Sequence, residues 1–111
     1  MDEKDFKTIN IIYNHINSVL TYCQDCKSLI DFQSDSMKVE ACVFNLMQIG
    51  ELAKTSLSDE AKNQMSSIPW KQIYGLRNRI VHEYFGVDMS MIWAVIKDNL
   101  SPLKNEIEHF L

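Results

Sequence analysis

The chain has 111 residues, which is the size of one domain with a single modest core and leaves no room for a second. Hydrophobic residues make up 46% and charged residues 23%, a composition too apolar for intrinsic disorder. Eleven Lys and Arg against fifteen Asp and Glu give a net charge of −4, so bulk charge will not hold the chain on a nucleic acid. We expect one domain over residues 1–111, in which any nucleic-acid role comes from a local site.

Residues that break regular structure are rare. The chain has three Gly and two Pro, where average usage would give about thirteen, and this scarcity favours long helices over strands. The start is charged, and the longest apolar run, Met91–Ile96, is far shorter than the ~20 residues of a membrane span. The three cysteines are odd in number, which fits a reducing compartment. We therefore expect a cytoplasmic protein with free thiols and no membrane anchor.

A stripe of apolar residues at steps of three and four begins at Phe6 and predicts a first helix over about Lys4–Ile30. The polar break at 33–36 supplies N-cap residues, so a second helix should follow to about Ser56. That helix is apolar on two sides, and we expect it to be the central helix of a bundle or part of a dimer surface, with Gly50 allowing close approach. One apolar face consists of Met37, Ala41, Phe44 and Leu52, and the other of Val43, Leu46, Met47, Gly50 and Ala53.

Three further elements are predicted in the second half of the chain. Ser58-Asp59-Glu60 opens a short acidic turn or helix, by both capping and dipole chemistry. Ile68-Pro69-Trp70 begins the next helix, with its proline at the first helical position and Gly86 just past the end. A last helix is capped by Asp88, and Pro102 should kink or interrupt it. The sequence thus predicts an all-α, up-down bundle of four long helices plus a short one.

Polar chemistry is concentrated in eight residues, Arg77-Asn78-Arg79-Ile80-Val81-His82-Glu83-Tyr84. They contain both arginines of the chain and one of its three histidines. A guanidinium is a permanently charged fork that matches phosphate oxygens, and an imidazole gives and takes protons near neutral pH. This combination suits the cleavage of a phosphodiester.

Helix geometry alone does not bring Arg77 and His82 together. Asn78 and His82 share a face, and so do Arg77 and Tyr84, whereas Arg77 and His82 point about 140° apart. Either the long arginine side chain wraps around, or the helix is distorted, or a second copy completes the site across a two-fold axis.

A purely structural interpretation of the same segment is also open. Arg79 and Glu83, at i and i+4, would form a surface ion pair. His82 would cap the helix or form a hydrogen bond, and Tyr84 would pack half-buried.

The segment resembles the Arg-(four residues)-His-any-Tyr signature of HepT-like proteins, a branch of the HEPN superfamily of small helical bundles. Asn45-Leu46-Met47-Gln48-Ile49-Gly50-Glu51 resembles the family's central-helix segment ending in Gly-Glu. Ile68-Pro69-Trp70 resembles the entry to its motif helix, and Val87-Asp88 with Trp93 resembles the family's segment after that helix. The resemblance covers about Ala41–Leu103 in specific residues, with no departure at the signature positions.

The resemblance implies a metal-independent endoribonuclease, the toxin of a type VII-like toxin–antitoxin pair, that acts as a homodimer with paired motifs. It implies that Arg77 holds and polarises the scissile phosphate of RNA, and that His82 transfers protons as the 2′-hydroxyl attacks. Asn78 would orient the imidazole or the phosphate, and Arg79 and Glu83 would only support the site.

The implied partner is a minimal nucleotidyltransferase antitoxin that neutralises the enzyme by attaching AMP to Tyr84. A bulky anionic adduct there would block the cleft and place negative charge beside Arg77. The resemblance implies no metal and no cofactor.

Other interpretations compete with this one. A non-catalytic dimeric subunit of a nucleotidyltransferase complex is favoured by the net charge of −4 and by the offset between Arg77 and His82. A plain helical scaffold would require the signature to be accidental.

Cys23-Gln24-Asp25-Cys26 has the spacing of zinc and redox sites but no second pair, so we expect buried, reduced thiols. Glu51 is either a solvent-facing carboxylate at a helix end or a partner of the motif helix.

Overall fold

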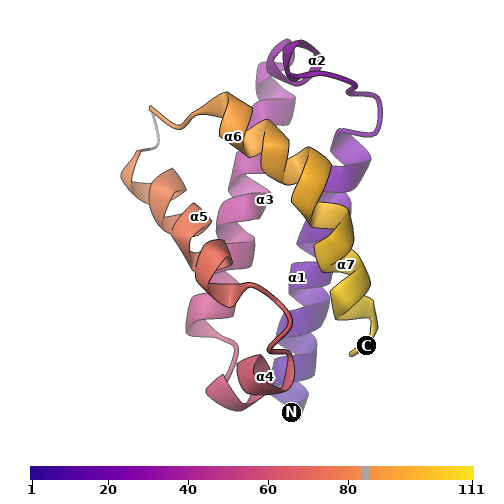
Figure 1. The fold of residues 1–111 in the computed structure, drawn as a ribbon, viewed down its shortest axis with the longest axis vertical. Coiled ribbons are helices and arrows are strands. Elements are labelled where there is room, and N and C mark those ends of the chain that lie inside the picture. Colours follow the sequence, from indigo (N-terminus) through magenta and orange to yellow (C-terminus); the bar gives the residue numbers. More distant parts are fainter. Residues whose placement is uncertain (84–85) are drawn as a thin grey trace.

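The computed structural model describes residues 1–83 and 86–111, and these residues form helices and no strand. The all-α bundle is therefore confirmed (Figure 1). Four long helical units are present as predicted, the last built from α6, a π-helical turn η1 and α7, together with two short helices where one was expected. The elements are α1 (Glu3–Tyr22), α2 (Leu29–Gln33), α3 (Ser36–Thr55), α4 (Asp59–Gln64), α5 (Trp70–His82), α6 (Met89–Ala94), η1 (Val95–Asn99) and α7 (Leu100–Glu108).

The first helix is shorter than the sequence pattern predicted. α1 ends at Tyr22 rather than near Ile30, and a separate short helix, α2, follows. Local polar side chains create this break. The Ser28 hydroxyl accepts a hydrogen bond from the backbone N–H of Asp31 (3.2 Å), and the Asp31 carboxylate accepts one from the N–H of Lys27 (2.9 Å). These contacts start a new helix and override the apolar periodicity.

α3 is the central helix, as its two apolar sides predicted. It begins after the N-cap Asp35 and packs against α1 on one side and α5 on the other (Figure 1). The two apolar faces are covered unequally within a single copy, because Leu52 packs on the core while other residues of its face are exposed. Leu46 and Ile49 are buried in the core, whereas Phe44 is 54% exposed and Met37 79% exposed.

A buried carboxylate fastens α1 to the loop before α4. Asp5 is only 2% exposed. It accepts hydrogen bonds from the backbone N–H of Ser58 (2.9 Å) and from the Ser58 hydroxyl (2.7 Å). That hydroxyl in turn accepts from the N–H of Ala61 (3.1 Å) and so caps α4, as predicted for the acidic segment.

The motif helix α5 begins one residue after Pro69 and ends at His82. Glu83 is its C-cap and donates its backbone N–H to the carbonyl of Arg79 (2.9 Å). The prediction that Gly86 directly follows the helix is therefore wrong, because the last helical hydrogen bond is made three residues earlier. Gly86 instead donates its N–H to the carbonyl of Glu83 (2.7 Å).

The last helix starts as predicted, and its interruption lies at residues 95–99, just before Pro102, where it was expected. The Asp88 carboxylate caps it by accepting from the N–H (2.9 Å) and the hydroxyl (2.6 Å) of Ser90. η1 then widens the helix, with the N–H of Leu100 donating to the carbonyl of Val95. Pro102 has no N–H for the carbonyl four residues earlier, and its ring would press on that carbonyl in a regular α-helix. The wider turn just before it relieves this conflict.

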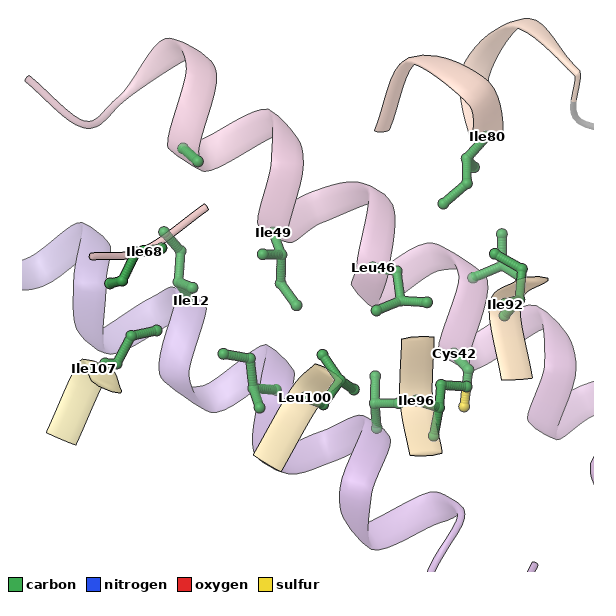
Figure 2. Packing of buried hydrophobic residues seen from close by; sticks show 14 of the residues in the cluster. Ile12, Cys42, Leu46, Ile49, Ile68, Ile80, Ile92, Ile96, Leu100 and Ile107 are labelled. Atoms are coloured by element: carbon green, nitrogen blue, oxygen red, sulfur yellow. The ribbon is translucent and has the colours of Figure 1, made fainter. Parts of the chain in front are cut away.

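The core runs between α1, α3 and the C-terminal helix (Figure 2). Ile80 is fully buried and points from α5 toward Leu46 and Ile92 (Figure 2). The face of α5 that carries Ile80 therefore packs against the core. No helix formed by the described residues has the length and apolar character needed to cross a bilayer.

Candidate active site

The motif helix presents its polar residues away from the core. Ile80 is its one buried residue among those described, while Asn78, Arg79 and His82 are exposed. Arg77 is intermediate, with 21% of its side chain exposed. The helix therefore displays the signature residues on a surface.

Two contacts fix the side chain of Arg77. Its Nε–H donates to Oε2 of Glu51 on α3 at 2.7 Å, which is a charge-assisted hydrogen bond between two helices. Its Nη1–H donates to Oδ1 of Asn78 at 2.9 Å. Asn78 was expected to orient the imidazole or the phosphate, which stays a prediction, and its Oδ1 contacts the arginine in the structure.

Gly50 allows the two helices to come this close. A Cβ added at position 50 would overlap Cβ of Arg77 and would lie 3.1 Å from the backbone oxygen of Ile73. The glycine therefore serves as the close-approach point that the sequence suggested. Its neighbour Glu51 is thereby placed beside the guanidinium.

Arg77 and His82 do not form a unit within one copy of the chain. α5 is regular α-helix through His82, so no distortion rotates the two residues together. The guanidinium is engaged by Glu51 and Asn78 and does not wrap toward the imidazole. Of the three arrangements considered from the sequence, neither the wrapped arginine side chain nor the distorted helix is present in this copy.

Two of the remaining signature residues, Arg79 and Glu83, form an ion pair at the surface. Nε of Arg79 lies 3.8 Å from Oε2 of Glu83, and both side chains are 54% exposed. This is the surface ion pair that the structural interpretation predicted, and such a pair contributes little. Tyr84 lies outside the described residues.

The site residues predicted from the sequence did not include Glu51. From the sequence it was either a solvent-facing carboxylate at a helix end or a partner of the motif helix. The structure confirms that partnership through the ion pair with Arg77. The Gly-Glu pair pointed to this residue, but the two partners are 26 positions apart in the sequence, which gave no indication of the side chain that Glu51 contacts.

The cysteines form a separate cluster at the other end of α3. Sγ of Cys23 lies 3.5 Å from Sγ of Cys42, and burial raises the pKa of both thiols. Cys26 is less buried and lies 3.6 Å from Nζ of Lys38, whose hydrogen bond to Asp25 raises the lysine pKa. All three thiols are free. Within residues 1–83 and 86–111, no group of three or more His, Cys, Asp or Glu side chains is placed to hold a metal ion.

One cavity in the described part of the chain does not include the signature residues. Its volume is about 450 Å³, and it lies between α3, α5 and the C-terminal helix. Its walls are mainly apolar and include Ile49, Leu76, Val95 and Leu103. Arg77 and His82 are not among its lining residues, so this cavity and the signature are distinct features.

Comparison with known proteins identifies the family of the chain. The family model described as "Ribonuclease HepT-like" matches residues 12–110. The chain belongs to the HepT-like ribonuclease family.

Relatives of this HepT-like chain carry names of the same kind. A candidate RNase of Caldanaerobacter subterraneus subsp. tengcongensis is 35% identical over 97 residues, covering 79% of this chain and 86% of the relative. A candidate RNase of Methanocaldococcus jannaschii is 29% identical over 109 residues, covering 97% and 98%. A candidate ribonuclease HepT of Thermococcus cleftensis is 32% identical over 78 residues, covering 70% of each chain. No solved structure gives a significant match.

Proposed function

We propose that the chain is a metal-independent endoribonuclease, the toxin of a type VII-like HEPN/nucleotidyltransferase toxin–antitoxin pair, with Arg77 and His82 as its catalytic residues. Family membership supports the ribonuclease. The observation that carries the assignment of residues is the display of a fixed guanidinium and an exposed imidazole on one helix, α5.

In this mechanism the RNA supplies its own nucleophile. The 2′-hydroxyl attacks the adjacent phosphorus, the bond to the 5′-oxygen breaks, and the products are a 2′,3′-cyclic phosphate and a 5′-hydroxyl. His82 takes or delivers the proton in this exchange, and Arg77 neutralises the charge that develops on the phosphate oxygens. Asn78 holds one N–H of the guanidinium.

We further propose a homodimer in which two copies of the motif face each other. Arg77 and His82 of one copy point to different sides, so each needs a group from a second copy. Two exposed apolar side chains also lie on the same helices as the site residues. Phe44 precedes Glu51 by seven residues on α3, Val81 follows Arg77 by four on α5, and the two apolar side chains are 54% and 42% exposed.

The regulatory part of the proposal concerns Tyr84. A nucleotidyltransferase antitoxin would transfer AMP from ATP to the phenolic oxygen and release pyrophosphate. The adduct would set a phosphodiester near the guanidinium of Arg77, where RNA phosphate would otherwise bind. The cytoplasmic location also stays a prediction, and the three free thiols fit it.

Cleavage of total cellular RNA in EDTA by unmodified, partner-free protein tests the enzyme. We expect cleavage by the wild type, and its loss by at least ~10²-fold in both Arg77→Ala and His82→Ala. Circular dichroism and oligomeric mass should not change in the variants. Full activity in both variants would overturn the assignment of the residues, and a wild type that is folded, unmodified and inactive would overturn the enzyme.

Intact mass spectrometry tests the modification. After incubation with the neighbouring nucleotidyltransferase and ATP, the wild type should gain the mass of AMP and Tyr84→Phe should not, because the variant lacks the acceptor oxygen. An adduct that persists in the variant would place the chemistry on another residue. His82→Ala serves as the control, since it removes catalysis and keeps the tyrosine.

The second candidate function is a non-catalytic dimeric subunit of a nucleotidyltransferase complex. The net charge of −4 favours it, because an acidic protein does not attract RNA over long range. This subunit would accept AMP at Tyr84 and leave RNA intact. The RNA cleavage and mass spectrometry experiments therefore separate the two functions.

A further inference from the structure

Arg77 is held at both ends of its side chain. At the root, its Cβ lies against the bare backbone of Gly50. At the tip, its Nε–H donates to Oε2 of Glu51 at 2.7 Å. Two consecutive residues of α3 therefore determine where the guanidinium of α5 sits. Neither belongs to the Arg-to-Tyr signature.

The donors that remain on Arg77 fit a phosphate. A guanidinium has five N–H groups. Glu51 takes the one on Nε, and Asn78 takes one on Nη1, so three N–H groups make no hydrogen bond with a described residue. The carboxylate thus occupies one edge of the planar fork and leaves terminal N–H groups for paired contacts with phosphate oxygens.

The pair also differs from a surface salt bridge. Arg79 and Glu83 lie one turn apart on the same helix, are separated by 3.8 Å and are both half-exposed. Glu51 and Arg77 come from two helices, their atoms are 2.7 Å apart, and the arginine is 21% exposed. A freely rotating arginine would have to be ordered during each reaction, whereas this contact orders it beforehand.

We propose that Glu51 is the positioning residue of the site, whose carboxylate holds the Arg77 guanidinium in the orientation that meets the scissile phosphate. The expected effect on RNA cleavage rests on the proposed ribonuclease function. The expected effect on the position of the Arg77 guanidinium rests only on the ion pair. Glu51 acts through Arg77. Removing its charge also removes a negative group near the phosphate, so RNA binding should not weaken.

The test uses Glu51→Ala and Glu51→Gln in the full chain, with Asp25→Asn as a matched control. Asp25 forms an ion pair of similar length, 2.8 Å, with Lys38 at the far end of α3. The chain has only two arginines, so the Nε–H signals of Arg77 and Arg79 can be observed separately by NMR after ¹⁵N labelling. Single-turnover cleavage at saturating RNA and the RNA dissociation constant are measured alongside.

We expect hydrogen exchange of the Arg77 Nε–H to accelerate strongly in Glu51→Ala and less in Glu51→Gln, which keeps an acceptor oxygen. The signal of Arg79 should not change. Cleavage at saturating RNA should fall ~10- to 100-fold in Glu51→Ala, with the dissociation constant unchanged or lower. The control should behave as the wild type in every measurement.

An unchanged Arg77 signal in Glu51→Ala would overturn the proposal. So would an altered signal accompanied by wild-type cleavage, or by a loss confined to RNA binding. If the wild type itself does not cleave RNA, the ribonuclease function fails separately. The Arg77 signal then still decides whether Glu51 holds the guanidinium.

Discussion

At the scale of single residues, Asp5 is a buried carboxylate without a cationic partner among the described residues that contact it. Its hydrogen bonds from the backbone N–H and the hydroxyl of Ser58 lower its pKa below the ordinary value. A carboxyl with a lowered folded-state pKa stabilises the fold above its unfolded pKa, and this stabilisation is lost as the pH falls through the folded value.

Asp5→Asn tests this linkage. The variant should unfold at a lower temperature than the wild type at pH 7, because the amide is a weaker acceptor and adds an N–H group that has to be accommodated. The difference in melting temperature should begin to shrink below about pH 4, the ordinary pKa of an Asp carboxyl, and should shrink further as the pH falls through the lowered pKa of the folded state. Thermal melts from about pH 7 down to about pH 2.5 span this range, with the exposed Asp98→Asn as control. A difference that stays constant over this range would contradict the assignment.

At the scale of elements, the contact between α3 and α5 places the site. Gly50 is the closest point, and the hydroxyl of Tyr74 donates to the carbonyl of Ala53 (3.3 Å) one turn further along. Ile80 fastens the far end of α5 to the core. The position of Arg77 therefore depends on the spacing of two helices.

Gly50→Ala should separate these helices. The added methyl group overlaps Cβ of Arg77 and presses on the backbone oxygen of Ile73, neither of which is the free end of a flexible side chain. We expect destabilisation by ~1–3 kcal/mol in urea unfolding. RNA cleavage should also fall under conditions where the variant is fully folded.

Gly75→Ala is the matched control for this substitution. It adds the same methyl group on α5, where nothing lies within 4 Å of it. Because alanine favours a helix over glycine, we expect stabilisation by ~0.5–1 kcal/mol and unchanged cleavage. Equal effects of the two substitutions would contradict the close-approach role of Gly50.

At the scale of the whole molecule, the proposed site requires two copies of the chain. Arg77→Ala and His82→Ala are each expected to be inactive alone. After the two proteins are unfolded together and refolded, half of the dimers should be mixed, and each mixed dimer holds one site with an intact Arg77 and an intact His82 from different copies. Cleavage should recover to about a quarter of the wild-type level. No recovery in verified mixed dimers would show that the site does not pair Arg77 of one copy with His82 of the other.

Much of this molecule follows from residue spacing, and the exceptions have physical causes. The spacing of apolar residues predicted α3 and its central place, and the capping residues Asp35, Ser58 and Asp88 marked three helix starts correctly. The end of α1 was missed because Ser28 and Asp31 make local hydrogen bonds that compete with an uninterrupted apolar stripe.

The site was predictable only in part. The position of α5 and of its polar residues could be predicted, because the signature places these residues within eight consecutive positions. The contact between Glu51 and Arg77 depends on how closely α3 and α5 pack. The periodicity of apolar residues predicts helices but does not predict the distance between them. In the proposed dimer, the way in which Arg77 meets His82 depends on a second copy, which no pattern within one chain can specify.

The π turn η1 has a consequence for how the molecule opens. α6 and α7 look continuous, yet between them the hydrogen-bond ladder changes from i−4 to i−5 and Pro102 contributes no N–H. We therefore expect α7, which packs on α1, to open separately from α6 and with a smaller free energy, a difference that hydrogen exchange of the backbone N–H groups would measure. Transient detachment of α7 would expose the cavity of about 450 Å³ to solvent, while the motif helix α5 would stay packed on α3.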